Sequence, residues 1–487
     1  MLSEELLILI KKIQEIKAES QNIEVKSAHN GCPKRLYDTL SSFSNQDGGG
    51  IIIFGLDKKQ GFEAVGVYDL QDLQKSITEQ CNQMEPSVRG IFTFAEYENK
   101  NICALEIPSV ELTERPCYYK GAGKIKGSYI RVGDADLLMT DYEIYSYESY
   151  KKHVHDDERE VERIDLSYMD IDNLNKYIIE KKQEKPKFSK LNEEQIYEML
   201  NIKRNGKFTL AAVMNFSLYP QGSFPQLGIT AVVVPGYNIG ELGNSGERFI
   251  DNKRIEGTIS EMLEEAMVFC KRNMKIKTII DSETGKRNDR TEYPINAVRE
   301  AILNALIHRD YSVHTEGTSI QINFFADRLE IHSPGGLYGR MTVEQLGKVR
   351  LDLRNPTLAT MAESLNQAEN RYSGIPTIRM EMKEYGLPEP EFKNGRNEFI
   401  VTLYNKKIEQ EELYLTLEDK IVEFCKEAKS RKEIAKFLEM KTTSYAYSKY
   451  ILPLLKQGRL AMTIPDIPAS KNQRYYKVKW LFFVKMM

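Results

Sequence analysis

The chain has 487 residues, a formal net charge of −3 and 41% hydrophobic residues, a size that normally divides into about three or four domains. The near balance of charge excludes a globally basic coat, so any nucleic-acid site has to be a local patch. No apolar run approaches the roughly 18 residues of a membrane span, and we expect no signal peptide. No CxxC pair occurs, which favours free thiols in a cytoplasmic protein over disulfides or a zinc site; the cysteines are Cys32, Cys81, Cys103, Cys117, Cys270 and Cys425.

The first predicted domain covers about 12–150, where a helix is followed by short apolar strands such as 50–55, 102–107 and 128–132. Charged residues near the strand ends stand out, because three carboxylates at one sheet edge can hold a divalent ion for phosphodiester hydrolysis. The alternative is an ordinary salt-bridge cluster with neighbouring arginines. The residues concerned are Glu19, Glu24, Lys26 and Asp57.

Two less informative segments follow. Residues 151–190 are rich in charge and include the run 156–160, so we expect a solvated helical linker. Residues 191–275 are predicted to form a middle α/β domain, with a strand at 227–234 and an amphipathic helix at about 255–273.

The next predicted domain, 276–405, contains the most informative stretch of the chain, a helix at 297–311 with one apolar face. Glu300, Asn304 and His308 follow at i, i+4 and i+8, so they form a polar row along this helix. A carboxylate can orient a water molecule, and an amide oxygen one turn away can hold a metal ion that bridges phosphates. The alternative is an amphipathic helix with a hydrogen-bonded asparagine. Strands are predicted at 318–325, 328–332 and 399–403.

The Glu-x-x-x-Asn spacing, followed by strands and a Gly-rich turn, resembles the first ATP-binding box of the GHKL ATPases. The 13-residue string 299–311 resembles the divergent ATP-binding domain of bacterial Schlafen AlbA_2-type regulators. The resemblance implies ATP and Mg²⁺ as ligands, with Glu300 as the catalytic residue and Asn304 as a metal ligand. It implies nucleotide contacts for Asn304, His308, Gly335, Gly336, Ser373 and Gly374.

This chain departs from the GHKL pattern in two places. Ser333-Pro334-Gly335-Gly336 replaces the Asp-x-Gly-x-Gly box, so the aspartate that reads the adenine amino group is missing there. The loop 371–376 stands in place of a Gly-Thr-Gly-Ile loop, and Pro376 removes one backbone donor for phosphates.

Four separated motifs of the first domain resemble the Schlafen AlbA_2 domain over nearly its whole length. They are Glu19-Ser20-x-x-x-Glu24-x-Lys26, Ser41-x-Phe43-x-Asn45-x-x-Gly48-Gly49, Gly55-Leu56-Asp57 and Tyr129-Ile130-Arg131-Val132-Gly133. In the nuclease members of that family, residues matching Glu19, Glu24 and Asp57 are catalytic and hold metal. Most bacterial relatives are described only as DNA-binding domains.

The last segment, 410–487, is predicted to be a winged helix-turn-helix. Ser430 caps a helix to about 438, a second helix covers 445–455, and a wing begins at Gly458. Eight basic residues and one acid lie between 441 and 479, which indicates a phosphate-binding patch; a winged helix that contacts protein is the alternative. The expected phosphate contacts are Lys441, Lys449, Lys456, Arg459, Lys471 and Arg474, with Ser444, Tyr445, Tyr447 and Ser448 at the start of the recognition helix.

The sequence therefore predicts an α+β multidomain protein with an AlbA_2 domain, a middle α/β domain, a GHKL-like α/β sandwich and a C-terminal winged helix. The leading functional hypothesis is a bacterial, cytoplasmic, homodimeric transcriptional regulator that binds ATP and DNA. One alternative is a nucleotide-gated, metal-dependent nuclease acting on RNA or DNA. Another is an interaction module with a degenerate ATP site.

Overall fold

The computed structural model describes residues 1–243, 245–280, 287–350, 352–366, 374–406, 421–422, 424–438, 443–456, 458–465, 470 and 472–478. The chain divides into two compact units, Met1–Asn405 and Lys406–Met487. The expected α+β multidomain class is confirmed, since helices alternate with several separate sheets in the first unit and with one described sheet in the second. No helix in the described part of the chain is both long and apolar enough to cross a membrane.

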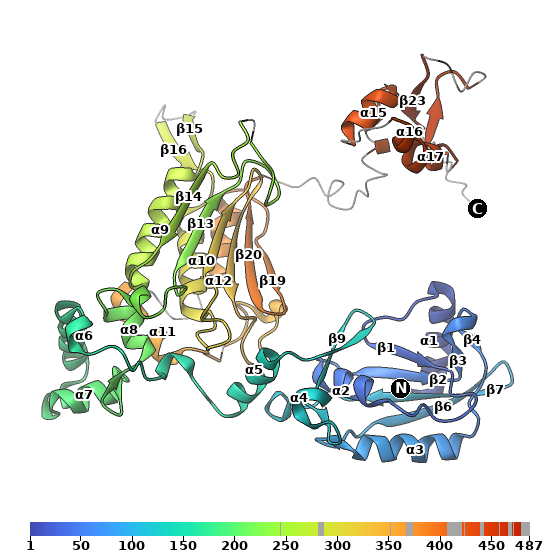
Figure 1. Ribbon diagram of the computed structural model, residues 1–487, viewed down its shortest axis with the longest axis horizontal. Helices are drawn as coiled ribbons and strands as arrows, with labels where there is room; N and C mark the ends of the chain where they lie inside the picture. The colour runs from blue at the N-terminus through green and yellow to red at the C-terminus, as the bar shows by residue number, and fades with distance from the viewer. Residues whose placement is uncertain are drawn as a thin grey trace. The chain divides into compact units, whose positions relative to one another are not determined.

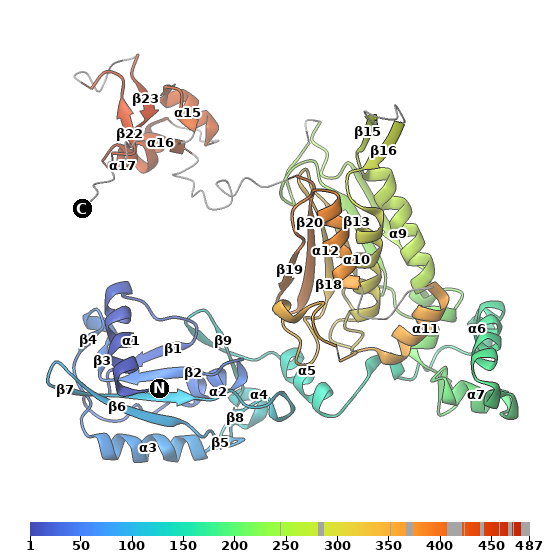
Figure 2. The ribbon, with the colours of Figure 1, turned by 180° about the vertical axis from the view of Figure 1, so that it is seen from behind.

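A four-stranded sheet forms the centre of the first domain, with the order β1-β2-β7-β6 (Figure 1). β1 runs parallel to β2, and the other pairs are antiparallel. Helix α1 covers one face, and α2 and α3 cover the other, as both ribbon views show (Figures 1 and 2). The bounds are α1 Ser3–Ile16, β1 Ile23–Lys26, α2 Tyr37–Asn45, β2 Gly50–Phe54, α3 Leu70–Asn82, β6 Ile91–Tyr97 and β7 Lys100–Ile107.

The alternation of side chains along β2 produces this three-layer arrangement, because successive residues of a strand point to opposite faces. Ile52 and Phe54 pack with the α2 and α3 side, whereas Ile53 packs with Leu6 and Ile10 of α1. Both faces of the strand are therefore buried, as its unbroken apolar sequence indicates.

Small elements complete this domain around the buried side chain of Asn45. Its Nδ2 donates to the carbonyls of Cys117 (2.8 Å) and Tyr129 (3.1 Å), and its Oδ1 accepts from the Cys117 amide (2.7 Å). Asn45 thus fixes two distant segments against the end of α2. The remaining elements are β3 Leu56–Asp57, β4 Glu63–Ala64, β5 Met84–Glu85, β8 Tyr118–Tyr119, α4 Gly123–Gly127, β9 Tyr129–Val132 and β10 Ala135–Leu138.

A six-stranded sheet with the order β14-β13-β17-β18-β20-β19 dominates the rest of the first unit (Figure 1). Only β13 and β17 pair in parallel. Helices α9, α10 and α12 cover one face of this sheet (Figures 1 and 2). The bounds are β13 Ile229–Val233, β14 Asp251–Ile255, α9 Ile259–Asn273, β15 Ile276–Ile280, β16 Arg287–Thr291, α10 Ile295–His308, β17 Ile320–Phe324, β18 Arg328–Pro334, α11 Pro356–Asn366, α12 Gly374–Glu384, β19 Glu391–Asn394 and β20 Glu398–Tyr404.

This sheet corrects the boundary expected between a middle domain, 191–275, and an ATP-binding domain, 276–405. β13 lies before that boundary and β17 after it, yet they pair from Ile229 with Ile320 to Val233 with Phe324. One continuous core joins residues from Val161 to Leu403. The sequence pattern shows where strands lie but does not show which strands pair, so the boundary at 275 was misplaced.

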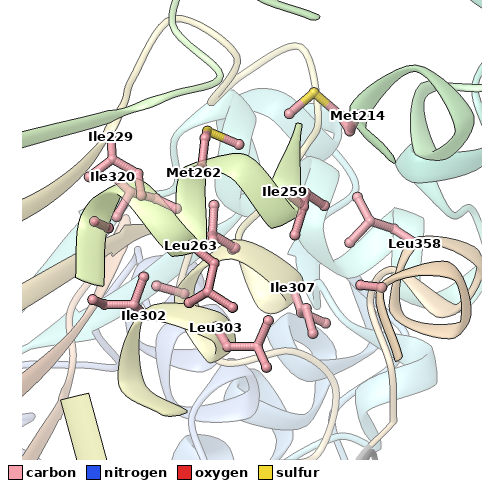
Figure 3. Close-up of a cluster of buried hydrophobic side chains, with 14 of the residues drawn as sticks. Met214, Ile229, Ile259, Met262, Leu263, Ile302, Leu303, Ile307, Ile320 and Leu358 are labelled. Atoms are coloured by element: carbon pink, nitrogen blue, oxygen red, sulfur yellow. The ribbon is translucent and has the colours of Figure 1, made fainter. Parts of the chain in front are cut away.

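Helix α10 is buried on almost every side. Besides its expected apolar face, Leu303 and Ile307 are also buried, at 3% and 8% exposure. Figure 3 shows Ile302, Leu303 and Ile307 among side chains of α9, such as Met262 and Leu263, with Leu358 of α11 nearby. Burial on so many sides leaves α10 only a narrow polar strip.

Asparagine 355 closes the C-terminal end of α10. Its Nδ2 donates to the carbonyls of Ile307 and Arg309, both at 2.8 Å, and the residue is 1% exposed. The last carbonyls of a helix have no partner inside the helix, so this side chain satisfies groups that would otherwise be buried and unpaired. The next residue, Pro356, begins α11.

The segment expected as a solvated linker is partly packed. Asp157 is fully buried, and its Oδ2 accepts from the Leu358 amide at 2.8 Å, at the start of α11. Glu158 Oε1 accepts from Thr357 Oγ1 at 2.9 Å. The charged run 156–160 therefore caps a helix rather than facing water. The nearby elements are α5 Asp141–Lys151, α6 Ile171–Glu184, α7 Glu193–Met199, β11 Lys203–Arg204, β12 Lys207–Phe208 and α8 Leu210–Phe216.

The second unit has its own small core, which includes Ile434, Ile451, Leu454 and Tyr475. Its three strands pair in the order β21-β23-β22. A run of helical turns between residues 443 and 456 lies between β21 and β22 in the sequence. The bounds are β21 Lys429–Ser430, α15 Arg431–Phe437, α16 Thr443–Ala446, the π-helical η8 Tyr447–Ile451, α17 Leu452–Lys456, β22 Leu460–Met462 and β23 Arg474–Lys477.

The Asn355→Ala change tests the closure of α10. It leaves two buried carbonyls without a donor, so we expect a loss of about 2 kcal/mol in the free energy of unfolding of the first unit. Urea denaturation followed by circular dichroism measures it. Asn296→Ala is the matched control, because Asn296 lies at the exposed start of the same helix and its side chain donates to Glu381; equal effects of the two changes would contradict this account.

Candidate functional site

The polar strip of α10 consists of Glu300, Asn304 and His308, all half-buried. Burial raises the pKa of Glu300, and the neighbouring Arg299 only partly offsets this effect. The buried Asn304 Nδ2 has no hydrogen-bond partner in the described structure, so this amide is available for a ligand.

The first residue of α12 lies directly against this strip. A Cβ atom added to Gly374 would stand 2.9 Å from Asn304 Nδ2 and 3.1 Å from Glu300 Oε2. The absence of a Cβ atom lets the backbone lie close to these two side chains, and the first amides of a helix are natural partners for phosphate. The structure thus brings Glu300, Asn304 and Gly374 together, while the expected contact Ser373 lies outside the described residues.

A cavity begins at Asn304 and continues past His308 to the turn after β18. Gly335 has φ +92°, and a Cβ there would come within 2.5 Å of both Asp310 Cβ and Arg354 Nη1. No L side chain fits this position. The cavity is lined by apolar groups as well as Asn304, His308, Ser333, Gly335, Gly336 and Arg354.

Arginine 354 is a member of this site that the sequence did not reveal. It is 6% exposed, its Nη2 donates to the Gly336 carbonyl at 2.9 Å, and its Nη1 lies 3.8 Å from Asp310 Oδ2. Burial alone would raise the pKa of Asp310, but Arg354 and hydrogen bonds from Ser312 hold it below its usual value. In the sequence, the string Arg354-Asn355-Pro356 is the feature that could have indicated this site. Its asparagine donates to the carbonyls at the end of α10, and its arginine donates to the glycine turn.

Most of the string His308-Arg309-Asp310-Tyr311 is structural. Arg309 is 1% exposed, and its Nη2 donates to the carbonyls of Thr315 and Thr318. The Tyr311 hydroxyl donates to the Leu306 carbonyl at 2.7 Å. Of these four residues only His308 lines the cavity.

The acidic residues of the first domain are engaged by other groups. Glu19 accepts from the Val25 amide (2.9 Å) and pairs with Lys58 (2.5 Å). Glu24 pairs with Lys26 at 2.7 Å and with Arg131 at 2.9 Å. Asp57 accepts from the Lys59 amide at 2.9 Å.

Glu19, Glu24 and Asp57 are not brought together as metal ligands. No group of three or more His, Cys, Asp or Glu side chains that could hold a metal ion occurs among the described residues. The cation Arg131, 1% exposed in its side chain, pairs with both Glu24 and Asp136. The arrangement corresponds to the salt-bridge alternative.

The basic residues of the C-terminal unit have mixed surroundings. Lys449 and Lys456 are exposed, and Lys449 Nζ donates to the Tyr445 hydroxyl at 3.1 Å. Arg474 is tied to the fold, since its Nη1 donates to the Ala428 carbonyl at 2.9 Å. Tyr447 lies under the Arg431 guanidinium, 3.8 Å from the ring centroid. Arg459 is half-buried; Lys441 and Lys471 lie outside the described residues, as do the side chains of Ser444 and Ser448.

Comparisons with known families account for three stretches of the chain. Residues 19–140 match the family "Schlafen, AlbA_2". Residues 317–403 match the HATPase_c_4 family, "Putative ATP-dependent DNA helicase recG C-terminal". The chain carries a Schlafen AlbA_2 domain and an HATPase-like domain. The expected resemblance is thereby confirmed, although α10 lies just before the matched part of the HATPase-like domain. Residues 419–477 match "Filamentation induced by cAMP protein Fic-like, C-terminal domain".

Two solved structures are similar to this chain. A crystal structure of the DIP2311 protein from Corynebacterium diphtheriae is 18% identical, with 94% of this chain and 93% of that chain covered and a TM-score of 0.39. A solution structure of the N-terminal domain of a RecG-related protein from Nitrosomonas europaea is 26% identical, with 27% and 91% covered and a TM-score of 0.23. No curated protein matches the chain.

The environment of His308 predicts a pH dependence of stability. Burial, together with the nearby charge of Arg354, lowers the pKa of His308 from 6.5 to about 4. The unfolded chain therefore takes up a proton near pH 6.5 that the folded chain refuses until about pH 4. Stability from this residue is intact above pH 6.5 and falls by up to about 3 kcal/mol as the pH drops toward 4.

The comparison of wild type with His308→Gln isolates this effect from other titrating groups. Urea unfolding between pH 4 and 7.5 should show a shallower loss of stability in the variant. Parallel pH profiles of the two proteins would contradict the lowered pKa of His308.

Proposed function

We propose that this protein is an ATP-binding, DNA-binding transcriptional regulator of the bacterial cytoplasm. The observation that carries the nucleotide assignment is the meeting of Glu300, Asn304 and Gly374 beside a cavity that Asn304 lines together with His308, Arg354 and apolar side chains. The matched families, one named for an ATP-dependent DNA helicase and one of the AlbA_2 type, support nucleotide use in association with nucleic acid.

The residues present fit a magnesium nucleotide. The unpartnered amide of Asn304 offers one ligand oxygen when suitably turned, and Mg²⁺ usually takes few protein ligands besides phosphates and water. Gly374 brings the first amides of α12 next to Asn304 and Glu300, and such amides are natural partners for phosphate. Bound Mg²⁺ would supply charge neutralisation for the phosphates, and Glu300 would orient water if hydrolysis occurs.

The opposite end of the cavity would receive the base. His308, neutral because of its lowered pKa, and the Gly335-Gly336 turn lie there, with Ile331, Phe399 and Val401 as apolar walls. The missing aspartate of the GHKL box has no replacement in the same turn. The apolar walls and the backbone of this turn would therefore contribute most of the base contacts.

The nuclease alternative receives no support from the geometry, because Glu19 pairs with Lys58, Glu24 pairs with Lys26 and Arg131, and Asp57 accepts from the Lys59 amide. DNA contact is assigned instead to the basic C-terminal unit, with lysines fixing the backbone and the start of α16 entering a groove. A homodimer would present two such units to a DNA site with two-fold symmetry.

Calorimetric titration with ATP and Mg²⁺ tests the nucleotide site. Asn304→Ala should weaken ATP binding by roughly 10- to 100-fold, because a group that contacts a charged ligand is lost. Glu300→Gln should retain binding and lose any hydrolysis. The matched control is Asn296→Ala on the same helix, which should bind as wild type does. No ATP binding by the wild type would instead favour the interaction module with a degenerate site.

The dependence of duplex DNA binding on salt tests the C-terminal unit. With about five phosphates contacted, log affinity should fall against log salt with a slope near −4 to −5. Removal of residues 406–487, which form a separate compact unit, should abolish most of that slope. Equal affinity and slope in the shortened protein would assign the basic patch to another partner.

A further inference from the structure

A second concave site lies in the AlbA_2 domain, apart from both the acidic residues and the nucleotide cavity. It occupies about 300 Å³ between the start of α2, β8, α4 and β9. α2 and α4 lie side by side in both ribbon views (Figures 1 and 2). Its lining includes Lys34, Arg35, Tyr37, Tyr119, Lys126 and Tyr129, which we call the tyrosine pocket.

Two tyrosines form a pre-built stack in this pocket. The rings of Tyr37 and Tyr119 lie 3.8 Å apart between centroids with planes inclined by 14°, and both side chains are only half-buried. The Tyr37 hydroxyl donates to Gln83 at 2.8 Å. A Cβ at Gly121 would come within 2.5 Å of the Tyr119 ring, so a glycine there lets the loop lie against it. Flat, fixed aromatic surfaces of this kind are where unpaired bases stack.

Positive charge surrounds this stack. Lys34 and Lys126 are exposed, and neither is within ion-pair distance of a carboxylate among the described residues. The one acid of the pocket, Asp38, is engaged by Arg35 at 3.3 Å, and Arg35 also donates to the Tyr129 hydroxyl. Of the four basic residues in the stretch 118–131, Lys120, Lys124 and Arg131 pair with acids elsewhere, so Lys126 contributes the exposed charge of this stretch.

We propose that the tyrosine pocket binds single-stranded nucleic acid. A base stacks against the Tyr37–Tyr119 pair, and Lys34, Lys126 and Arg35 contact the neighbouring phosphates. A duplex keeps its bases stacked on each other and cannot offer one to the pocket, so single strands are preferred. The inference rests on the proposed function only in taking nucleic acid as the partner. It adds to the duplex-binding C-terminal unit a second surface that prefers single strands.

The test measures fluorescence anisotropy of labelled 12-nucleotide single strands of DNA and RNA with the full-length protein. In Lys34→Ala/Lys126→Ala, the affinity for single strands should fall roughly tenfold. The slope of log affinity against log salt should become less steep by about 1.4, because two phosphate contacts are lost. Tyr119→Leu should weaken binding roughly tenfold without changing that slope. Thermal unfolding of Tyr119→Leu checks that the domain stays folded. The double variant Lys34→Ala/Lys126→Ala changes only exposed side chains, so it tests the site independently of folding.

Lys11→Ala/Lys12→Ala is the matched control, because it removes two exposed lysines of α1 from the same domain. This control should bind single strands as wild type does. Unlabelled single strand should displace the probe at lower concentration than duplex or poly-glutamate. Equal competition by duplex or by poly-glutamate would overturn the proposed stacking site.

Two further outcomes separate this inference from the proposed function. If the wild type binds single strands and both pocket variants bind them equally well, the tyrosine pocket is wrong, while ATP binding and duplex binding by the C-terminal unit are unaffected. If the wild type binds no nucleic acid of any kind, the DNA-binding part of the proposed function fails together with the pocket.

Discussion

The burial of α10 is the constraint on which the nucleotide site depends. The helix is enclosed by the six-stranded sheet and by α9, α11 and α12, and its side chains from Ala297 to Ile307 contribute to one continuous core. Because apolar contacts occupy almost its whole circumference, Glu300, Asn304 and His308 can face only one direction. The start of α12 lies beside Glu300 and Asn304, and the turn after β18 lines the same cavity as Asn304 and His308, so core packing sets the direction in which these polar groups face.

Buried polar side chains hold the two ends of this cavity in place. Asn355 closes the C-terminal end of α10, and Arg354 joins the glycine turn to Asp310. The Tyr142 hydroxyl donates to Asp310 at 2.8 Å, which connects α5 to the same group. Low local dielectric makes such a network strong when every partner is present and costly when one is missing. The walls of the cavity are therefore coupled to the segment that follows the AlbA_2 domain.

The AlbA_2 domain uses its charges differently on its two sides. Around Glu24 the acids are matched by Lys26 and the buried Arg131, which favours a structural role. At the tyrosine pocket the lysines stay exposed and the aromatic rings are pre-stacked. β9 joins both regions, since Tyr129 borders the pocket and Arg131 pairs with Glu24. A nucleic-acid strand bound in the tyrosine pocket would therefore contact β9, whose Arg131 is held by ion pairs with Glu24 and Asp136.

The sequence by itself determined the local features of this protein. Helical spacing predicted the polar row Glu300, Asn304 and His308, and short apolar runs predicted β2, β7, β13 and β20, because both patterns depend on neighbouring residues. The four ordered motifs identified the AlbA_2 domain. Only the tertiary structure decided which strands pair, and it joined β13 to β17 across the expected boundary. It also brought Arg354 to the cavity, some fifty residues after Asn304, and paired Glu19 with Lys58 and Glu24 with Arg131. These outcomes depend on contacts between distant segments, and no local pattern of residues records such contacts.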